Sequence, residues 1–231
     1  KDSLSWQRGG NVNLGIILLL APMSGAAGAV LFDNEQVNAR ELRGKLRELI
    51  QSTTPSDAVA VYKAINLAVP GRVLGHVDEL DVTDKSAVTL IREEGVTLLD
   101  IFKKCAIKDS ICMEWVSGFE TTFSVGHPYL KDAVEGNRDT NSAIVDTFLE
   151  LLSKNPDSLI TRKRGLVMAQ GVSDKAKYIL KTGGSTSETG KKLLWALDDE
   201  LHQSGGVLNP GTTADLVAAS IFVLLLEGWR P

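Results

Sequence analysis

The sequence predicts an all-α protein, a single-domain bundle of many helices in which the central helices are buried. Apolar residues recur at helical spacing along most of the chain, and no segment of useful length alternates as a strand would. Aromatic residues make up only 6% of the chain, whereas Leu, Ala and Val are abundant, a bias that suits helices better than a β-sandwich. Because 43% of the 231 residues are hydrophobic and no long Pro-, Ser- or Gly-rich linker divides them, we expect residues 1–231 to form one domain.

The first predicted helix covers residues 14–32, which carry no charge and are long enough to span a bilayer. Arg8 precedes this segment, and its small residues also imitate a signal peptide. Pro22, Gly25 and Gly28 argue against both interpretations. We favour a central helix that is apolar all round because it is buried all round, and we keep a small membrane-anchored protein as an alternative.

The remaining helices follow from periodicity and from start and stop signals. They are expected over residues 40–51, 56–68, 96–106, 109–123, 141–152, 173–180, 193–201 and 216–226. Ser56-Asp57 and Ser173-Asp174 have the pattern of N-caps. Ser185 with Glu188, and Thr212 with Asp215, have the spacing of capping boxes. Residues 72–77 or 80–83 could be extended.

The two cysteines, Cys105 and Cys112, do not form a disulfide framework. On one helix they would lie about 10 Å apart, beyond the roughly 7 Å that a disulfide can bridge between Cα atoms. We therefore expect reduced core cysteines in a cytosolic protein. The three histidines are scattered, so a zinc site is improbable. A net charge of −4 does not indicate a nucleic-acid-binding surface.

One dense basic cluster occurs, at Arg162, Lys163 and Arg164. It is either a solvated turn or a clamp for an anion, since Arg and Lys are the side chains that bind phosphate. The run of residues 184–191 does not match a P-loop, because five residues separate its glycines and Lys192 follows Lys191.

The richest candidate site is the segment Asn209-Pro210-Gly211-Thr212-Thr213-Ala214-Asp215. Its Pro-Gly turn leads into a helix N-terminus, where backbone N–H groups and partial positive charge favour an anion. Its Asp could hold Mg²⁺, which prefers oxygen ligands, although a plain capping box explains the same letters. Asn11 and Asn13 precede the apolar helix and are either N-caps or ligand contacts.

These segments together resemble the triphosphoribosyl-dephospho-coenzyme A synthase family. The family carries an Asn-Thr-His-Lys-Gly stretch before a long apolar helix, an Asp-Thr-Asn-type stretch followed by Arg and Gly, and Asn-Pro-Gly-Gly-Ser-Ala-Asp before the last helix. This chain has, in the same order, residues 11–15, Asp157-Ser158-Leu159 followed by residues 162–165, and residues 209–215. It looks closest to an archaeal and methylotroph branch with Asn-Pro-Gly-Thr-Thr-Ala-Asp.

The resemblance implies an all-helical cytoplasmic enzyme. Its reaction would transfer triphosphoribosyl from ATP to 3′-dephospho-coenzyme A or a related acceptor and release adenine, with Mg²⁺ as cofactor. No nucleic acid or membrane partner is expected, and a homo-oligomer is left open. The alternatives are a non-catalytic nucleotide- or coenzyme-binding helical protein and a cofactor-biosynthesis transferase with another acceptor.

The motif matches suggest residue roles. Asp157 and Asp215 would bind magnesium or serve as the base. Phosphate or nucleotide contacts would come from the matched polar residues and glycines, namely Asn11, Asn13, Gly15, Arg162, Lys163, Arg164, Asn209, Gly211, Thr212 and Thr213. Two departures from the citrate-lyase enzymes weaken the substrate assignment: their His-Lys pair is Asn13-Leu14 here, and their Pro-Lys-Pro-Gly-type segment has no match. We therefore expect either a missing N-terminal segment or a different acceptor.

Overall fold

The computed structural model describes residues 13–68 and 86–231, and the described residues are helical with no strand. The prediction of an all-α fold is confirmed. Asn11 and the expectations for residues 69–85 lie outside the described ranges. The helices are α2 (Leu14–Asp33), α3 (Ala39–Gln51), α4 (Pro55–Ala68), α5 (Ala87–Glu93), α6 (Leu98–Cys105), α7 (Ser110–Ser117), the π-helical η1 (Thr122–Gly126), α8 (His127–Glu135), α9 (Thr140–Lys154), α10 (Ser158–Arg164), α11 (Leu166–Lys181), the 3₁₀-helical η2 (Gly184–Thr186), α12 (Glu188–Gln203) and α13 (Gly211–Leu226).

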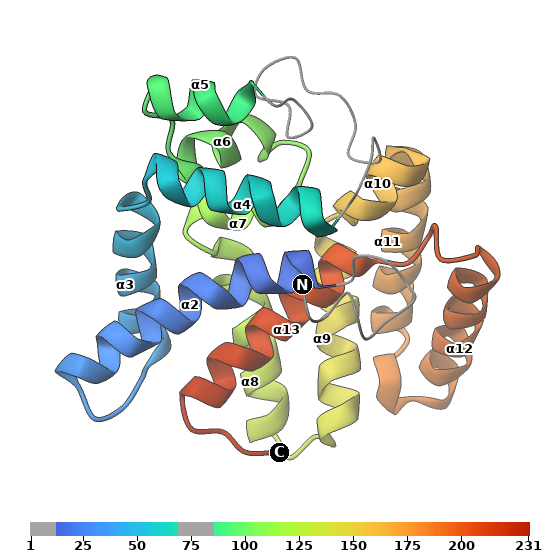
Figure 1. The fold of residues 1–231 in the computed structure, drawn as a ribbon. Helices are drawn as coiled ribbons and strands as arrows, with labels where there is room; N and C mark the ends of the chain where they lie inside the picture. The colour runs from blue at the N-terminus through green and yellow to red at the C-terminus, as the bar shows by residue number, and fades with distance from the viewer. Residues whose placement is uncertain (1–12, 69–85) are drawn as a thin grey trace.

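The last helix, α13, occupies the middle of the protein (Figure 1). It packs against α2, α8, α9, η1 and α10, with α4 to α7 stacked on one side and α10 to α12 on the other. Its buried residues include Leu216, Ala219 and Val223, and two of its threonines are buried as well. The prediction of a buried central helix is therefore confirmed for α13.

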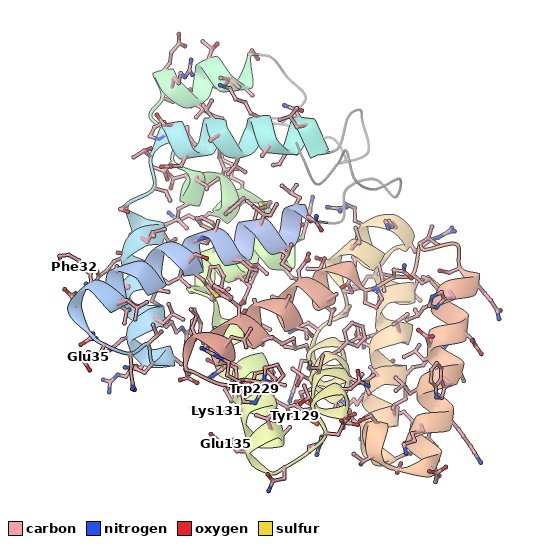
Figure 2. All side chains as sticks on the ribbon, turned by 60° about the horizontal axis from the view of Figure 1, so that its bottom comes forward. Phe32, Glu35, Tyr129, Lys131, Glu135 and Trp229 are labelled. Atoms are coloured by element: carbon pink, nitrogen blue, oxygen red, sulfur yellow. A yellow bond between two sulfur atoms is a disulfide. The ribbon has the colours of Figure 1, made fainter. Side chains whose placement is uncertain are left out.

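Helix α9 joins the hydrophobic clusters to one another. Leu151 belongs to the large cluster formed with α2 to α7 and α13, and Leu149 belongs to the cluster formed with α10 to α12. Ala143, also on α9, packs with Leu130 and Leu224 in a third cluster, against which Trp229 packs (Figure 2). Because one helix contributes to all three clusters, we propose that the described residues form one domain.

Helix α2 has only one buried face, so the prediction that it is buried all round is wrong. Its neighbours α3, α7 and α13 cover one side, whereas Ile17 and Leu31 on the other are exposed and Phe32 is 92% exposed (Figure 2). Ser24, Gly25, Gly28 and Ala29 make up much of that exposed face, and such small residues present little apolar area to water. Among the described residues, α2 is the one helix long and apolar enough to cross a membrane, by length and composition alone.

Two of the expected helix boundaries are wrong because tertiary contacts override local signals. Residues 109–123 do not form one helix, because Gly118 adopts the left-handed conformation (φ 66°) and ends α7. Ser173 does not cap a short helix but lies buried inside α11, where its hydroxyl donates to the Leu152 carbonyl at 2.6 Å.

The expected helix caps are also placed differently. Ser187, not Ser185, caps α12 by accepting the Gly190 N–H at 2.9 Å, because Ser185 is turned inward and donates its N–H to Asp146 at 2.7 Å. Helix α4 begins at Pro55, so Ser56 and Asp57 lie in its first turn. The Asp57 carboxylate reaches back to accept the N–H and the hydroxyl of Thr54.

The prediction of reduced cysteines is wrong, because Cys105 and Cys112 form a disulfide. The distance argument assumed one continuous helix. Helix α6 ends at Cys105, the chain turns over residues 106–109, and α7 begins at Ser110. The turn brings the two Cα atoms to 6.0 Å, within the range that a disulfide requires.

Candidate active site

The N-terminal ends of four helices, α2, α7, α10 and α13, meet at one place. Ser158, at the start of α10, accepts the Ser110 N–H of α7 at 3.2 Å and donates to the Thr212 hydroxyl of α13 at 3.2 Å. Gly15, in the first turn of α2, lies against Asp215 of α13. We call this place the helix junction. It comprises Gly15, Asp109, Ser110, Asp157, Ser158, Thr212, Thr213 and Asp215.

Asp157 ties α10 to α13 at the junction. One carboxylate oxygen accepts the backbone N–H groups of Leu159 and Ile160 at 2.8 and 3.1 Å, which is the geometry of an N-cap. The other accepts both the N–H and the hydroxyl of Thr213, each at 2.8 Å. Asp157 is 2% exposed, and four hydrogen bonds use the lone pairs that a carboxylate offers.

Asp215 has different surroundings. Burial, followed by the negative charges of Asp157 and Asp109, raises its pKa from 3.8 to about 7, against the lowering effect of a hydrogen bond from the Ile16 N–H. A carboxyl group with a pKa near neutrality can accept or donate a proton under physiological conditions. The partly buried Asp215 is therefore the best-placed acid–base group of the junction.

Gly15 allows Asp215 to approach α2. A Cβ atom at position 15 would lie 2.9 Å from the Asp215 Cγ and would overlap its Oδ2. Gly211 serves a similar purpose between α10 and α13, since a Cβ there would lie 2.8 Å from the Leu159 Cδ2. Both glycines therefore act as points of close packing at the junction.

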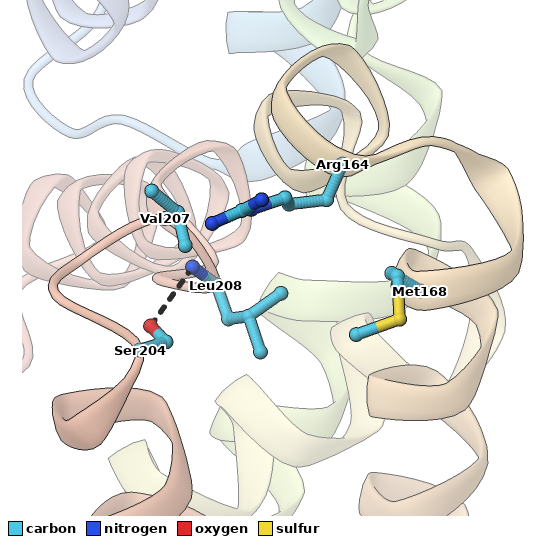
Figure 3. A pocket seen from close by; sticks show the side chains of 5 residues that line it. All are labelled: Arg164, Met168, Ser204, Val207 and Leu208. Atoms are coloured by element: carbon cyan, nitrogen blue, oxygen red, sulfur yellow. Dashed lines mark hydrogen bonds between the residues drawn. The ribbon is translucent and has the colours of Figure 1, made fainter.

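The basic cluster divides over two sides of α10. The Arg162 guanidinium lies 3.7 Å from the Asp109 carboxylate, on the junction side. Lys163 donates to the Gly206 carbonyl at 3.4 Å. Arg164 lines a separate cavity of about 320 Å³ with Met168, Ser204, Val207 and Leu208 (Figure 3). Residues two apart on a helix point in nearly opposite directions, which explains why Arg162 and Arg164 do not form one clamp.

The segment of residues 209–215 does not contain the expected capping box. Helix α13 begins at Gly211 with no side-chain cap, so Thr212 and Asp215 lie inside its first turns. The hydroxyls of Thr212 and Thr213 are buried and bonded to Ser158 and Asp157, whereas Asn209 is exposed.

Asn13 occupies the N-cap position of α2. Its side chain makes no capping hydrogen bond, and its carbonyl accepts the Ile17 N–H at 3.0 Å. The junction therefore includes the start of α2 mainly through the backbone of Gly15 and Ile16.

Two junction residues were not singled out by the sequence analysis. Asp109 stood among many acidic residues, and Ser110 gave no signal of its own. The one available signal was the repeated pattern Asp109-Ser110-Ile111 and Asp157-Ser158-Leu159, which starts two helices with the same cap. No group of three or more His, Cys, Asp or Glu residues able to hold a metal ion occurs within residues 13–68 and 86–231.

Comparison with known proteins places these observations in a family. The family model described as CitG, ATP:dephospho-CoA triphosphoribosyl transferase, matches residues 1–231. The 2-(5″-triphosphoribosyl)-3′-dephosphocoenzyme-A synthases of Escherichia fergusonii and Klebsiella pneumoniae are 34% and 33% identical over 107 residues. These matches cover 46% of this chain and 35% of each relative. The chain thus matches only about a third of the length of these curated relatives.

A solved structure extends the likeness over the fold. A crystal structure provisionally described as a triphosphoribosyl-dephospho-coA synthase from Archaeoglobus fulgidus matches with a TM-score of 0.72 and 27% identity. The match covers 95% of this chain and 84% of that one. Together with the family match along the whole chain, it shows that this protein belongs to the ATP:dephospho-CoA triphosphoribosyl transferase family.

Proposed function

We propose that this protein transfers the triphosphoribosyl group of ATP to 3′-dephospho-coenzyme A or a related acceptor and releases adenine. Family membership supports the reaction class. The structural observation that carries the proposal is Asp215, a partly buried carboxyl group with a pKa near 7 at the junction of four helices. This group is the acid–base residue that such a transfer requires.

In the proposed reaction, the 2′-hydroxyl of the acceptor attacks C1′ of the ATP ribose. The C1′–O bond forms as the bond from C1′ to adenine breaks, and the triphosphate stays on the transferred ribose. Asp215 accepts the proton of the attacking hydroxyl, the leaving adenine takes up a proton from solvent, and Asp215 then returns its proton to solvent. A carboxylate near C1′ would also stabilise the positive charge that develops there, as in glycoside chemistry.

Asp157 acts as a positioning residue in this proposal rather than as the base. Its two oxygens are occupied by four protein donors, so the carboxylate holds Thr213 and the start of α13 in place. Its negative charge also helps to keep the pKa of Asp215 near 7. Asp157 thereby tunes the group that carries out proton transfer.

The phosphates of ATP need positive partners. Arg162 is the member of the basic cluster on the junction side, and we assign it to phosphate binding. Three other residues remain predicted phosphate contacts: Lys163 and Arg164 on α10, and Asn209 just before α13. Asn13 and Gly15 lie at the start of α2, where they could contact the base or the ribose, and Asn11 is proposed for the same contact.

Magnesium would enter with the ATP phosphates. Mg²⁺ typically keeps several water ligands and binds one or two carboxylates together with substrate oxygens. Among the described residues, Asp215 accepts a hydrogen bond from the Ile16 N–H, which leaves oxygen lone pairs that fit this use, whereas the Asp157 oxygens are occupied by four donors. The ion would neutralise phosphate charge, and binding this ion is the alternative role of Asp215 to that of the base.

We further propose that the protein works in the cytoplasm with small-molecule partners. The substrates implied by the family are soluble metabolites, and the net charge of −4 gives nucleic acid no broad basic surface. The one helix with the length to span a membrane, α2 among the described residues, buries one face against α3 and α13.

Release of free adenine from ATP tests the proposal. The purified chain is incubated with Mg²⁺, ATP and dephospho-coenzyme A, and adenine is quantified by chromatography. We expect release that depends on the acceptor and is lost in the Asp215→Asn variant. ATP binding without adenine release for any acceptor with a free ribose hydroxyl would instead support the non-catalytic binding protein. Release with another acceptor but not with dephospho-coenzyme A would identify a transferase of different specificity.

A further inference from the structure

The disulfide encloses part of the helix junction. Cys105 ends α6, Cys112 lies in the first turn of α7, and the bond between them closes a ring of residues 105–112. Two junction residues, Asp109 and Ser110, lie within this ring. The geometry of the ring therefore bears on the site that the proposed function uses.

Asp109 is bonded to both ends of the ring. Its N–H donates to the Cys105 carbonyl at 3.1 Å, and its Oδ1 accepts the N–H of Cys112 at 3.2 Å. With Oδ1 committed in this way, Oδ2 faces the Arg162 guanidinium at 3.7 Å. The direction in which Asp109 presents its charge thus depends on the relative positions of the two cysteines.

Ser110 links the ring to α10 and α13 through hydrogen bonds. Its N–H donates to the Ser158 hydroxyl, which in turn donates to the Thr212 hydroxyl. Cys105, Asp109, Ser110, Ser158 and Thr212 therefore form one continuous path of bonds. The path starts at the disulfide and ends in the first turn of the helix that carries Asp215.

The two cysteines differ in exposure. Cys105 is half-buried, whereas Cys112 is 8% exposed, so Cys105 is the half of the disulfide that lies nearer to solvent. Ile107, inside the ring, is 88% exposed, so the ring faces solvent at this residue. A disulfide that is partly exposed and not fully enclosed by the core can exchange with thiols.

We propose that the Cys105–Cys112 pair is a thiol–disulfide exchange site that controls the order of the helix junction. A small dithiol attacks the Cys105 sulfur, forms a mixed disulfide and releases the Cys112 thiolate. The second thiol of the reagent then displaces Cys105. The protein gains two thiols, and the reagent leaves as its own disulfide, so two electrons and two protons pass to the protein.

The reduced state has partners for the new thiol. The Cys105 sulfur lies 3.6 Å from the Ile101 carbonyl oxygen and 3.5 Å from that of Phe102, and either carbonyl could accept its S–H. The oxidised state holds Asp109 and Ser110 within a closed ring, whereas the reduced state lets the turn of residues 106–109 move relative to α7. Since a preorganised site binds more tightly than one that must be ordered on binding, the oxidised form is the better nucleotide-binding form.

The sequence makes the experiment specific. Cys105 and Cys112 are the only two cysteines of the chain, so a reductant acts on no other pair. The folded wild-type protein is treated with dithiothreitol, and thiols are counted by alkylation and intact-mass measurement. Hydrogen exchange is then followed at residues 109–112, with the start of α9 (Asp139 to Ser142) as a remote helix start for comparison. The Cys105→Ser/Cys112→Ser variant serves as a permanently reduced form.

We expect two alkylated thiols, exchange at residues 109–112 faster by about tenfold or more, and no change at the start of α9. ATP affinity and adenine release should fall by about tenfold on reduction and recover on reoxidation, whereas the double-serine variant should not respond to the reductant. If that variant does not fold, the reduced wild-type protein supplies the same measurement.

Several results would overturn the proposal. They are an absence of alkylation under native conditions, unchanged exchange at residues 109–112, or full ATP affinity and activity after reduction. The activity readout rests on the proposed function, but the exchange readout does not. If the oxidised protein neither binds ATP nor releases adenine, the proposed function fails, and hydrogen exchange alone decides whether the disulfide orders the junction.

Discussion

Asp157 and Asp215 lie at the starts of two helices that pack against each other, and their motifs predicted the same candidate roles for both carboxylates. The start of α10 surrounds Asp157 with four donors and leaves it 2% exposed. Helix α13 places Asp215 one turn in, partly buried, where it accepts the Ile16 N–H and faces the charges of Asp157 and Asp109. The two residues belong to equally suggestive motifs, but the hydrogen-bond donors around them differ.

This difference supports a structural role for Asp157 and the proton-transfer role that we propose for Asp215. Asp157 is an acceptor whose hydrogen bonds are complete, so its main effect is to fix α10 and α13 relative to each other. Asp215 is partly buried and lies near like charge, and both effects favour its protonated form. If this distinction holds, substitutions at the two positions should have opposite patterns of effect on stability and activity.

Asp157→Ala should produce the largest effect. The change removes an N-cap and leaves buried N–H donors of Ile160 and Thr213 without a partner. We expect a loss of about 3 kcal/mol in the free energy of unfolding, from a cap worth about 1 kcal/mol and buried unsatisfied donors worth about 1 kcal/mol or more each. Urea unfolding followed by circular dichroism measures it, and adenine release should be lost as well.

Asp139→Ala provides the matched control, because Asp139 also caps a helix, accepting the Ser142 N–H, but is exposed. It should lose clearly less stability than Asp157→Ala and should keep its activity. Equal losses in the two variants would show that Asp157 is an ordinary cap. Its hydrogen bonds from Thr213 would then not stabilise the contact between α10 and α13.

Asp215→Asn should show the opposite pattern. Loss of a general base lowers rate by roughly 10²- to 10⁴-fold, so adenine release should fall by that factor. Stability should not fall, because an uncharged amide no longer faces the charges of Asp157 and Asp109. Unfolding midpoints and adenine release are measured on the same preparation. Near wild-type activity in a folded Asp215→Asn protein would exclude Asp215 as the base.

The helices were predictable from sequence because their apolar residues repeat with the helical period. Leu42, Leu46 and Ile50 on α3 are spaced by four residues, and all three are buried. The boundaries were less predictable where a side chain has a distant partner. Ser173 looks like a cap in sequence but bonds to the Leu152 carbonyl, 21 residues away along the chain.

The candidate site was predictable only in part, for the same reason. The motifs pointed to Asp157 and Asp215, but nothing local distinguishes a carboxylate that meets Thr213 across a helix contact from one that does not. Asp109 joins the site at the break between the predicted helices of residues 96–106 and 109–123, a break that the distance argument for the cysteines left out. The disulfide was missed with it, since the distance between the cysteines depends on that turn.

Gly15→Ala tests whether adenine release depends on the position of the Asp215 carboxyl group as well as on its chemical identity. The added methyl would lie 2.9 Å from the Asp215 Cγ and would displace the carboxyl group. A shift of about 1 Å in a catalytic group can lower rate by about 10²-fold, and we expect a loss of that order in adenine release. Gly28→Ala on the same helix is the control, since a Cβ there meets nothing within 4 Å. The control should keep full activity, and equal activity in the two variants would contradict the close-packing account.

The pH dependence of stability gives the finest test. The pKa of Asp215 is raised in the folded state, mainly by burial and then by Asp157, from 3.8 to about 7. The folded state therefore binds this proton more tightly than the unfolded state. The stability that the bound proton contributes is fully present below pH 3.8 and is lost as the pH rises through about 7.

Subtracting wild-type unfolding free energies from those of Asp215→Asn cancels the other titrating groups. The difference should shift in favour of the variant across that window and then level off. A difference that stays flat would mean that Asp215 titrates as an ordinary carboxylate, and the contrast with Asp157 would then rest on hydrogen bonding alone.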